Sequence, residues 1–242
     1  MSLKTVQIDV TSDVICPFCP LGVKQLTTAI DKYKSTHPSA PEFNIRFLPY
    51  QLDPTLDEKP IQRKDHLARK FGAERVEPME KAMIERFKTI GWTTDFSGPM
   101  SSSHLAHRLL SWASRRVPQN QFALSMDLFE GFHSNKHHTS DKQWLASLGV
   151  KHKMFANEQQ ALDWLHSDEC DLEVRNAYKS AQQAGITGVP FFVFQDKYAA
   201  SGAAGTEEFV SLLEEIIRRE TAAAAKVAES QPESVTVEGA VC

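Results

Sequence analysis

The sequence has little of several features that would assign it to a special class of protein. It has no basic excess, because 27 Lys and Arg face 31 Asp and Glu, whereas nucleic-acid binders usually carry a basic surplus. No stretch approaches the roughly 20 apolar residues that span a bilayer. Residues 1–7 lack the apolar segment of a secretory signal. We therefore expect a cytoplasmic protein with neither a nucleic-acid nor a membrane partner.

Cysteine is also scarce, with four residues in a chain of 242. They stand at positions 16, 19, 170 and 242, too few and too scattered for a framework of structural disulfides. A structural zinc site needs four ligands, usually from two pairs, and neither Cys170 nor Cys242 has such a partner in sequence. These absences leave one reactive pair, Cys16 and Cys19, two bystanders and no expected metal site.

The pair stands in the segment Cys16-Pro17-Phe18-Cys19, where an alternating strand pattern at residues 5–11 gives way to a helical one. A thiol at a helix N-terminus faces unpaired backbone N–H groups and the positive end of the helix dipole, which favour the thiolate. Pro17 suits the first helical position, because no N–H is needed there. The segment is typical of a redox-active thiol pair.

Periodicity divides the chain into three parts. A strand–helix–strand unit fills about residues 5–50, and a block with helical spacing and no strand signal runs from about 62 to 184. A hairpin at 190–194 and 198–201 and a helix from Thr206 follow. The pattern predicts an α/β fold, thioredoxin-like, with a large helical domain inserted between the βαβ and ββα units.

The predicted boundaries follow from these changes of pattern. The thioredoxin-like domain comprises residues 1–58 and 174–220, the inserted helical domain 59–173, and a disordered tail 221–242. Within the insertion, helices are expected at 75–90, 104–116, 121–132, near 141, near 158 and at 172–184. Thr139 or Ser140 is expected to cap the helix near 141, and Asn157 the one near 158.

Gly188-Val189-Pro190 immediately precedes the hairpin. It resembles the cis-proline loop of the thioredoxin superfamily, in which the residue before proline offers its backbone to a thiol substrate. This resemblance implies a cis peptide bond between Val189 and Pro190. The alternative is an ordinary trans proline at the start of an edge strand.

The chain as a whole resembles the DsbA-like thioredoxin family, and within it the FrnE-like branch associated with polyketide biosynthesis clusters and stress responses. The same superfamily holds kappa-class glutathione transferases and 2-hydroxychromene-2-carboxylate isomerases, which bind glutathione and usually have serine in place of Cys16. Ser102-Ser103, where branch members often have Asn-Thr, and Pro20 depart from the pattern. The matching segments are Ser-Asp-Val-Ile-Cys-Pro-Phe-Cys at 12–19, Ala-His-Arg-Leu at 106–109, Gly-Val-Pro-Phe-Phe-Val at 188–193 and Tyr-Ala-Ala-Ser-Gly-Ala at 198–203.

The resemblance implies a role for each site residue. Cys16 is expected to be the exposed, attacking sulfur and Cys19 the more buried sulfur that resolves the mixed disulfide. Asp13 is expected either to handle protons or to cap the first turn, and capping or local hydrogen bonding is favoured. The residues expected to contact the substrate are Pro17, Phe18, Val189 and Pro190.

Three functions remain open from the sequence. The first is a thiol–disulfide oxidoreductase acting on a protein or small-molecule thiol or disulfide. The second is a glutathione-dependent isomerase or transferase of a small aromatic or polyketide-like molecule, and the third is a non-catalytic binding protein. No cofactor is expected to be obligatory, glutathione enters as redox partner or cosubstrate, and the oligomeric state is open, a dimer included.

Two further groups of residues are given structural interpretations. Trp112, Phe129, Phe132 and Trp144 have helical spacing and are expected in the core rather than in a substrate groove. His133, His137 and His138, near Asp141, match no strong metal-binding pattern and are expected to be ordinary polar loop residues.

Overall fold

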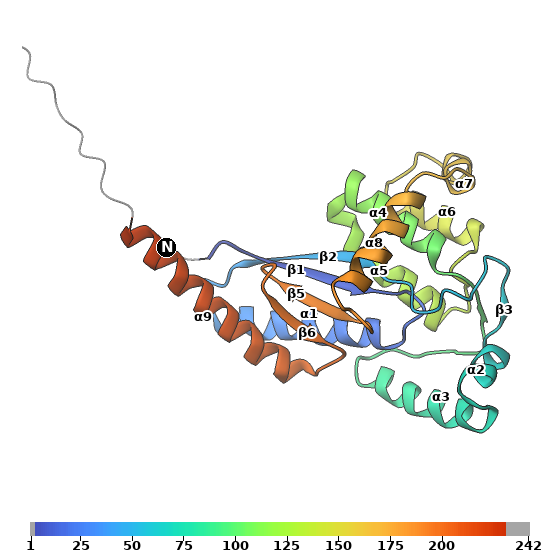
Figure 1. Ribbon diagram of the computed structural model, residues 1–242, viewed down its shortest axis with the longest axis horizontal. Coiled ribbons are helices and arrows are strands. Elements are labelled where there is room, and N and C mark those ends of the chain that lie inside the picture. The colour runs from blue at the N-terminus through green and yellow to red at the C-terminus, as the bar shows by residue number, and fades with distance from the viewer. Residues whose placement is uncertain (1–2, 231–242) are drawn as a thin grey trace, which may run out of the picture.

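The computed structural model describes residues 3–230 and contains a four-stranded mixed sheet (Figure 1). β1 (Thr5–Ser12) pairs in parallel with β2 (Glu42–Pro49) and antiparallel with β5 (Phe191–Phe194). β6 (Tyr198–Ser201) pairs antiparallel with β5, giving the order β2-β1-β5-β6. The predicted βαβ and ββα units are confirmed, because the first strand pair is parallel and the last is a hairpin.

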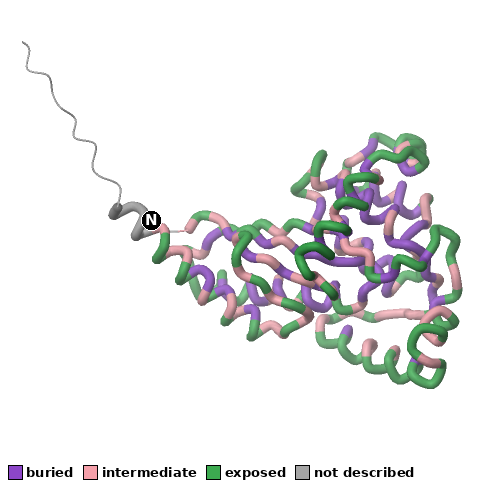
Figure 2. Tube along the Cα trace, viewed as in Figure 1, coloured by how far each residue is buried: buried purple, intermediate pink, exposed green. Residues whose placement is uncertain are grey.

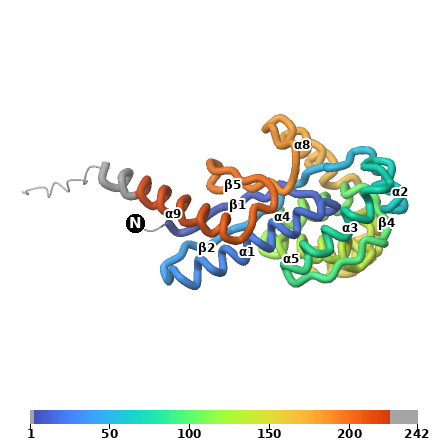
Figure 3. Tube along the Cα trace, turned by 90° about the horizontal axis from the view of Figure 1, so that it is seen from below, coloured from blue at the N-terminus to red at the C-terminus, as the bar shows by residue number. Residues whose placement is uncertain are grey.

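Two long helices pack against each other beside this sheet, α1 (Phe18–Thr36) and α9 (Thr206–Ser230) (Figures 1 and 3). α9 begins at Thr206 as predicted, but residues 221–230 are helical and not disordered. The reason is local: four consecutive alanines at 222–225 favour helix without needing a packed face. The remainder of the predicted tail, 231–242, lies outside the described residues.

The block between β2 and β5 is helical, with one departure from the prediction. Two strands of two residues, β3 (Ile61–Gln62) and β4 (Pro99–Met100), pair antiparallel, although no strand signal was expected there. Strands this short show no periodicity in sequence. The helices of the block are α2 (Arg63–Phe71), α3 (Ala73–Lys88), α4 (His104–Arg116), α5 (Pro118–His133), α6 (Lys142–Lys151), α7 (Glu158–His166) and α8 (Asp171–Gln183).

The N-caps of two helices, α6 and α7, were predicted from the sequence. Asn157 caps α7 as predicted, its side chain accepting from Gln160 N. α6 is capped by Asp141, which accepts from Trp144 N, so the prediction of Thr139 or Ser140 was wrong. Those two hydroxyls instead donate to backbone carbonyls of the segment before α4.

One hydrophobic core joins the sheet to most of the helical block. The alternating residues of β1, Val6, Ile8 and Val10, are fully buried in it together with leucines of α4 and α5. Phe129, Phe132 and Trp144 are buried in the core as expected, although Phe132 also lines the cavity described below, and Trp112 packs partly buried against the core. The division into domains at 58/59 and 173/174 stays a prediction, since this core runs across it.

The helices α2 and α3 are the exception to this burial (Figure 2). Arg63 is the one buried residue of α2, and only Val76 and Phe87 are buried in α3. Of the helices described between residues 3 and 230, none has the length and apolar character needed to span a bilayer. The α2–α3 pair is therefore a lightly anchored unit beside a well-packed body.

Candidate active site

The two cysteines lie in the turn that links β1 to α1. Cys16 N donates to Asp13 O and Cys19 N donates to Cys16 O, each at 3.1 Å, so the chain tightens directly into the helix. Pro17 has helical φ and ψ but precedes the first helical residue, Phe18, one position earlier than expected. Both sulfurs are free thiols. The sequence therefore brings the pair together by local geometry alone.

Cys16 is only 3% exposed, so the expectation of an exposed attacking sulfur was wrong. Its thiol donates to the carbonyl of Val189, 3.3 Å away. Val189 and Pro190 are joined by a cis peptide bond. The loop reaches Cys16 because Thr11, near the end of β1, pairs with Phe191 at the start of β5.

Gly22 sets how closely α1 approaches this loop. A Cβ atom there would lie 2.9 Å from Pro190 Cγ and 3.2 Å from Phe192 Cζ. Both distances are shorter than ordinary carbon contacts. Pro190 is buried, and the absence of a side chain at position 22 lets α1 pack closely against the loop that carries Val189.

Cys19 lies deeper than Cys16 and is fully buried. Burial raises the pKa of the Cys19 thiol well above its ordinary value, and a hydrogen bond with Cys16 raises it further. Cys19 is therefore a protonated thiol near neutral pH. A thiol beside the first sulfur is placed to attack a mixed disulfide once it loses its proton.

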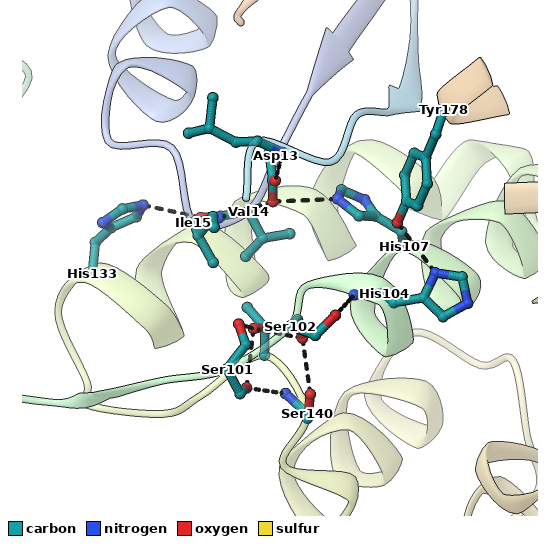
Figure 4. A network of polar contacts seen from close by, with 12 residues as sticks. Asp13, Val14, Ile15, Ser101, Ser102, His104, His107, His133, Ser140 and Tyr178 are labelled. Carbon is teal, nitrogen blue, oxygen red and sulfur yellow. Dashed lines mark hydrogen bonds and ion pairs between the residues drawn. The ribbon is translucent and has the colours of Figure 1, made fainter. Parts of the chain in front are cut away.

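Asp13 is completely buried and holds the turn before the cysteines (Figure 4). Its carboxylate accepts from Ile15 N at 3.2 Å and from Leu52 N at 2.7 Å. His107 Nε2 lies 3.3 Å from Asp13 Oδ1 and donates to it. Local hydrogen bonding, favoured from the sequence, is confirmed, and His107 joins α4 to the turn.

Beyond His107 the polar contacts continue toward the surface (Figure 4). The Tyr178 ring packs edge-on against the His107 ring, with centroids 5.8 Å apart. Burial raises the pKa of Tyr178, so its hydroxyl stays protonated and donates to His104 Nδ1 at 3.3 Å. His104 Nε2 then donates to Asp171, whose pKa is lowered to about 2 by Arg175 first and His104 second.

His133 was expected to be an ordinary polar loop residue, and this prediction was wrong, because His133 is the buried last residue of α5. It is fully buried, and its Nε2 donates to Val14 O at 3.1 Å, two residues before Cys16 (Figure 4). Its Nδ1 has no partner. Burial, then the charge of Arg63, lowers the pKa of His133 well below its ordinary value, so the ring is neutral.

The neighbouring histidines serve other contacts. His137 stacks on Trp144 with centroids 4.6 Å apart, and His138 Nδ1 lies 3.1 Å from the Ser101 hydroxyl. Within the part of the chain that the structure describes, no group of three or more His, Cys, Asp or Glu is arranged to hold a metal ion. Cys170 is buried beside Arg115, 3.6 Å away, and Cys242 lies outside the described residues.

A cavity of about 500 Å³ opens beside the cysteines. Three of the predicted substrate-contacting residues, Pro17, Phe18 and Val189, line it with Cys16, whereas Pro190 does not. The wall opposite the cysteine turn comes from α2 and α3, and the guanidinium of Arg86 lies 5.4 Å from the centre of the Phe18 ring. The cavity therefore gives a small molecule access to a sulfur that is otherwise covered.

Sequence reasoning did not assign the buried Arg63 and His133 to this cavity. Neither stands near a cysteine in sequence or belongs to a motif. The unusual burial of an arginine at the start of a polar helix becomes evident only once α2 is placed. No pattern in the sequence could have assigned them to the site.

Residues 7–214 match the family model described as the DSBA-like thioredoxin domain. A search of curated proteins gave no significant match. The match covers nearly all of the sheet, the helical block and the first part of α9, so it includes every residue of the site described above.

Solved structures give the same fold. A protein described as a probable DsbA oxidoreductase from Streptomyces coelicolor is 24% identical, with a TM-score of 0.73 over 97% of this chain and 95% of that chain. The cytosolic disulfide reductase DsbM from Pseudomonas aeruginosa, solved with glutathione, is 11% identical, with a TM-score of 0.55 over 88% of this chain and 99% of that one. A 2-hydroxychromene-2-carboxylate isomerase is 12% identical, with a TM-score of 0.59 over 91% and 98%. The predicted thioredoxin-like fold with its helical insertion is confirmed.

Proposed function

Because the chain belongs to the DsbA-like thioredoxin domain family, we propose that it is a thiol–disulfide oxidoreductase whose working pair is Cys16 and Cys19. The observation that carries the proposal is the arrangement at Cys16. Its sulfur lies against the Val189 carbonyl and lines the cavity, with the protonated Cys19 buried behind it. An incoming sulfur and the resolving thiol can thus reach Cys16 from different sides.

The exchange proceeds in two steps. Cys16, as a thiolate, attacks one sulfur of a substrate disulfide; a mixed disulfide forms and the other substrate sulfur leaves as a thiolate. Cys19 loses its proton and attacks the Cys16 sulfur, which releases the second substrate thiolate and closes the Cys16–Cys19 disulfide. The protein gives up two electrons and the substrate gains them, and the reverse sequence oxidises a dithiol.

The test is turnover of a model disulfide by the reduced protein. Cys16→Ser is expected to abolish exchange, since no nucleophile remains, and Cys19→Ser is expected to accumulate mixed disulfides detectable by mass spectrometry. Cys170→Ser is the matched control and is expected to retain the rate, because Cys170 is buried elsewhere. Undiminished exchange in Cys16→Ser would refute the proposal.

A second candidate is glutathione-dependent isomerisation or transfer on a small molecule. The observation that favours it is the size of the cavity beside Cys16, together with the fold shared with DsbM solved with glutathione and with a 2-hydroxychromene-2-carboxylate isomerase. It requires glutathione to bind noncovalently along Val189 and turnover to survive Cys19→Ser. Absence of glutathione binding in calorimetry would remove it.

The third candidate, a non-catalytic binding protein, draws on the low exposure of Cys16. It requires Cys16 to be inert toward small alkylating reagents, whereas an oxidoreductase whose sulfur lines an open cavity requires rapid alkylation. Mass spectrometry of iodoacetamide-treated protein separates the two. We propose a cytoplasmic location for the oxidoreductase, which the fold shared with the cytosolic disulfide reductase DsbM supports.

A further inference from the structure

The rim of the cavity beside Cys16 concentrates exposed apolar side chains. Among the described residues, the large hydrophobic side chains classed as exposed are Phe18, Leu52, Phe71, Met79 and Leu172. The first four line this cavity, and only Leu172 lies elsewhere. Exposed apolar side chains are ordinary when scattered, but a group around one opening marks a surface that a ligand covers.

The interior of the cavity continues this apolar character. Phe96 and Phe132 lie on its wall with Met83 and Met100. Aromatic rings and thioether sulfurs favour contact with flat, polarizable groups. A volume of about 500 Å³ is in the range of small-molecule sites. The lining therefore suits an aromatic molecule better than glutathione, whose peptide backbone and charges would lose water against these side chains.

One charged group in the wall is incompletely satisfied. Arg63 is 3% exposed, and its Nη2 donates to Phe132 O at 3.1 Å. Its guanidinium carbon lies 4.0 Å from the centre of the Phe132 ring and 5.5 Å from that of Phe96. Its Nε has no hydrogen-bond partner. Among the described residues, no carboxylate lies within ion-pair distance of Arg63.

Burying a cation without a counter-ion costs free energy. Burial accordingly lowers the pKa of the Arg63 guanidinium to about 10. Glu80 and Asp95 act on it only through longer-range attraction. The other cationic side chains of the wall differ from Arg63: Lys70 pairs with Asp53, and Arg86 is exposed and lies over the Phe18 ring. Arg63 is thus the buried positive charge in this wall that an anionic ligand would complete.

We propose that this cavity binds a small aromatic disulfide or thiol that carries a carboxylate, with the carboxylate at Arg63 and the sulfur at Cys16. The inference rests on the proposed oxidoreductase function and names its substrate class. The planar fork of an arginine suits a carboxylate, and two aromatic rings hold that fork in place. In the reaction, the aromatic disulfide is reduced to two aromatic thiols, and the Cys16–Cys19 dithiol is oxidised to the disulfide.

Two aromatic disulfides test the charge directly. The pre-reduced full chain is mixed with 5,5′-dithiobis(2-nitrobenzoate), which carries two carboxylates, or with neutral 4,4′-dithiodipyridine. The rate at which the aromatic thiol is released is then divided by the rate at which free glutathione releases it from the same reagent. Arg63→Met is expected to lower the normalised rate for the carboxylate reagent about tenfold, through loss of a charge-assisted contact. The dipyridine rate should stay within about twofold. Arg218→Met, on the exposed face of α9, is the matched control and should change neither rate.

A second variant guards against misfolding of Arg63→Met. Glu80 lines the same cavity and carries the opposite charge, so Glu80→Gln is expected to raise the rate with the carboxylate reagent and leave the dipyridine rate unchanged. Thermal unfolding of each variant reports its folding. Equal responses of the two reagents to both substitutions would overturn the inference while leaving the oxidoreductase function intact.

A binding measurement that involves no thiol exchange tests the cavity assignment independently of the redox proposal. The Cys16→Ser/Cys19→Ser protein is titrated with 5-(methylthio)-2-nitrobenzoate, a thioether that cannot exchange, and with 4-(methylthio)pyridine. The carboxylate is expected to bind, and adding Arg63→Met should weaken it about tenfold. No binding, or equal binding with and without Arg63→Met, refutes the cavity assignment. If the carboxylate binds but the wild-type protein exchanges with neither disulfide, the oxidoreductase proposal fails and the binding site stands.

Discussion

The two sides of Cys16 differ in how one buried charged group on each side is satisfied. On the side of α4 and α8, the Asp13 carboxylate accepts hydrogen bonds from Ile15, Leu52 and His107. On the side of α2 and α3, Arg63 is buried without a counter-ion and apolar side chains face outward. The first side resembles a protein interior, whereas the second resembles half of an interface.

This difference indicates which side of the site fixes the cysteine turn and which side leaves room for a ligand. A fully buried carboxylate that holds backbone N–H groups fixes the turn, since any movement would leave those donors unpaired. An open wall of aromatic side chains leaves room for a variable partner. The side of α4 and α8 therefore fixes the positions of the two sulfurs, and the side of α2 and α3 determines which ligand fits.

Substitution of the two buried aspartates gives the largest contrast. Asp13→Ala is expected to cost about 3–5 kcal/mol of unfolding free energy, because it strands two backbone donors and His107 in the interior. Asp53, on the cavity side, accepts hydrogen bonds from Lys70, Thr55 and His66, and the Lys70 and Thr55 side chains reach water. Asp53→Ala should therefore cost less, about 1–2 kcal/mol, because these two partners can turn to solvent. Urea denaturation measures both, and equal losses would contradict the distinction between the two sides.

Alanine substitutions at two glycines, one on α1 and one in the cavity wall, compare how tightly the two regions are packed. Alanine for glycine inside a helix usually stabilises by about 1 kcal/mol, but Gly22→Ala drives a methyl group into Pro190 and is expected to destabilise by about 1–2 kcal/mol net. Gly188, in the cavity wall, has no atom within 4 Å of an added Cβ. Gly188→Ala should therefore be close to neutral when both variants are compared by thermal unfolding. A stabilised Gly22→Ala protein would show that α1 and the loop can separate.

The third comparison concerns pH. Burial lowers the pKa of His133 in the folded protein, so the folded state binds fewer protons than the unfolded state as pH falls below the ordinary histidine pKa of about 6.5. Stability is complete above that pH and falls below it, by up to about 1.4 kcal/mol per pH unit for one proton. His133→Gln, which keeps a donor for Val14 O, should flatten the dependence between pH 7 and 5.

His104 is the control on the opposite side. Its pKa is also lowered by burial, but Asp171 offsets part of that shift, so His104→Gln should flatten the pH dependence less than His133→Gln. Unfolding free energies from urea titrations at several pH values measure both. A larger change in the His104 variant would reverse the assignment.

Much of the fold was predictable because its signals are local. The alternation of Val6, Ile8 and Val10 gave β1, and the spacing of His104 to Arg116 gave α4 without error. Cys16 and Cys19 stand together in sequence, so their proximity needed no tertiary information. Asp13 was singled out for the same reason, and its local hydrogen bonding was the interpretation favoured.

What could not be predicted depends on contacts between distant segments. The burial of Cys16 comes from Val189, 173 residues away, and nothing near residue 16 signals it. The hydroxyls of Thr139 and Ser140 were expected to cap α6, but they satisfy carbonyls of Ser101 and Ser102 instead. Arg63 and His133 reached the site through the packing of α2 and α5, which no periodicity encodes.

The antiparallel register of β1 with β5 also has a consequence for how the protein is made. Synthesis runs from the N-terminus, so Cys16 and Cys19 emerge from the ribosome early, whereas Thr11 finds Phe191 only after the whole helical block has been translated. Until then no Val189 carbonyl covers Cys16. The growing chain therefore carries two uncovered thiols until the loop that contains Val189 and strand β5 have been translated.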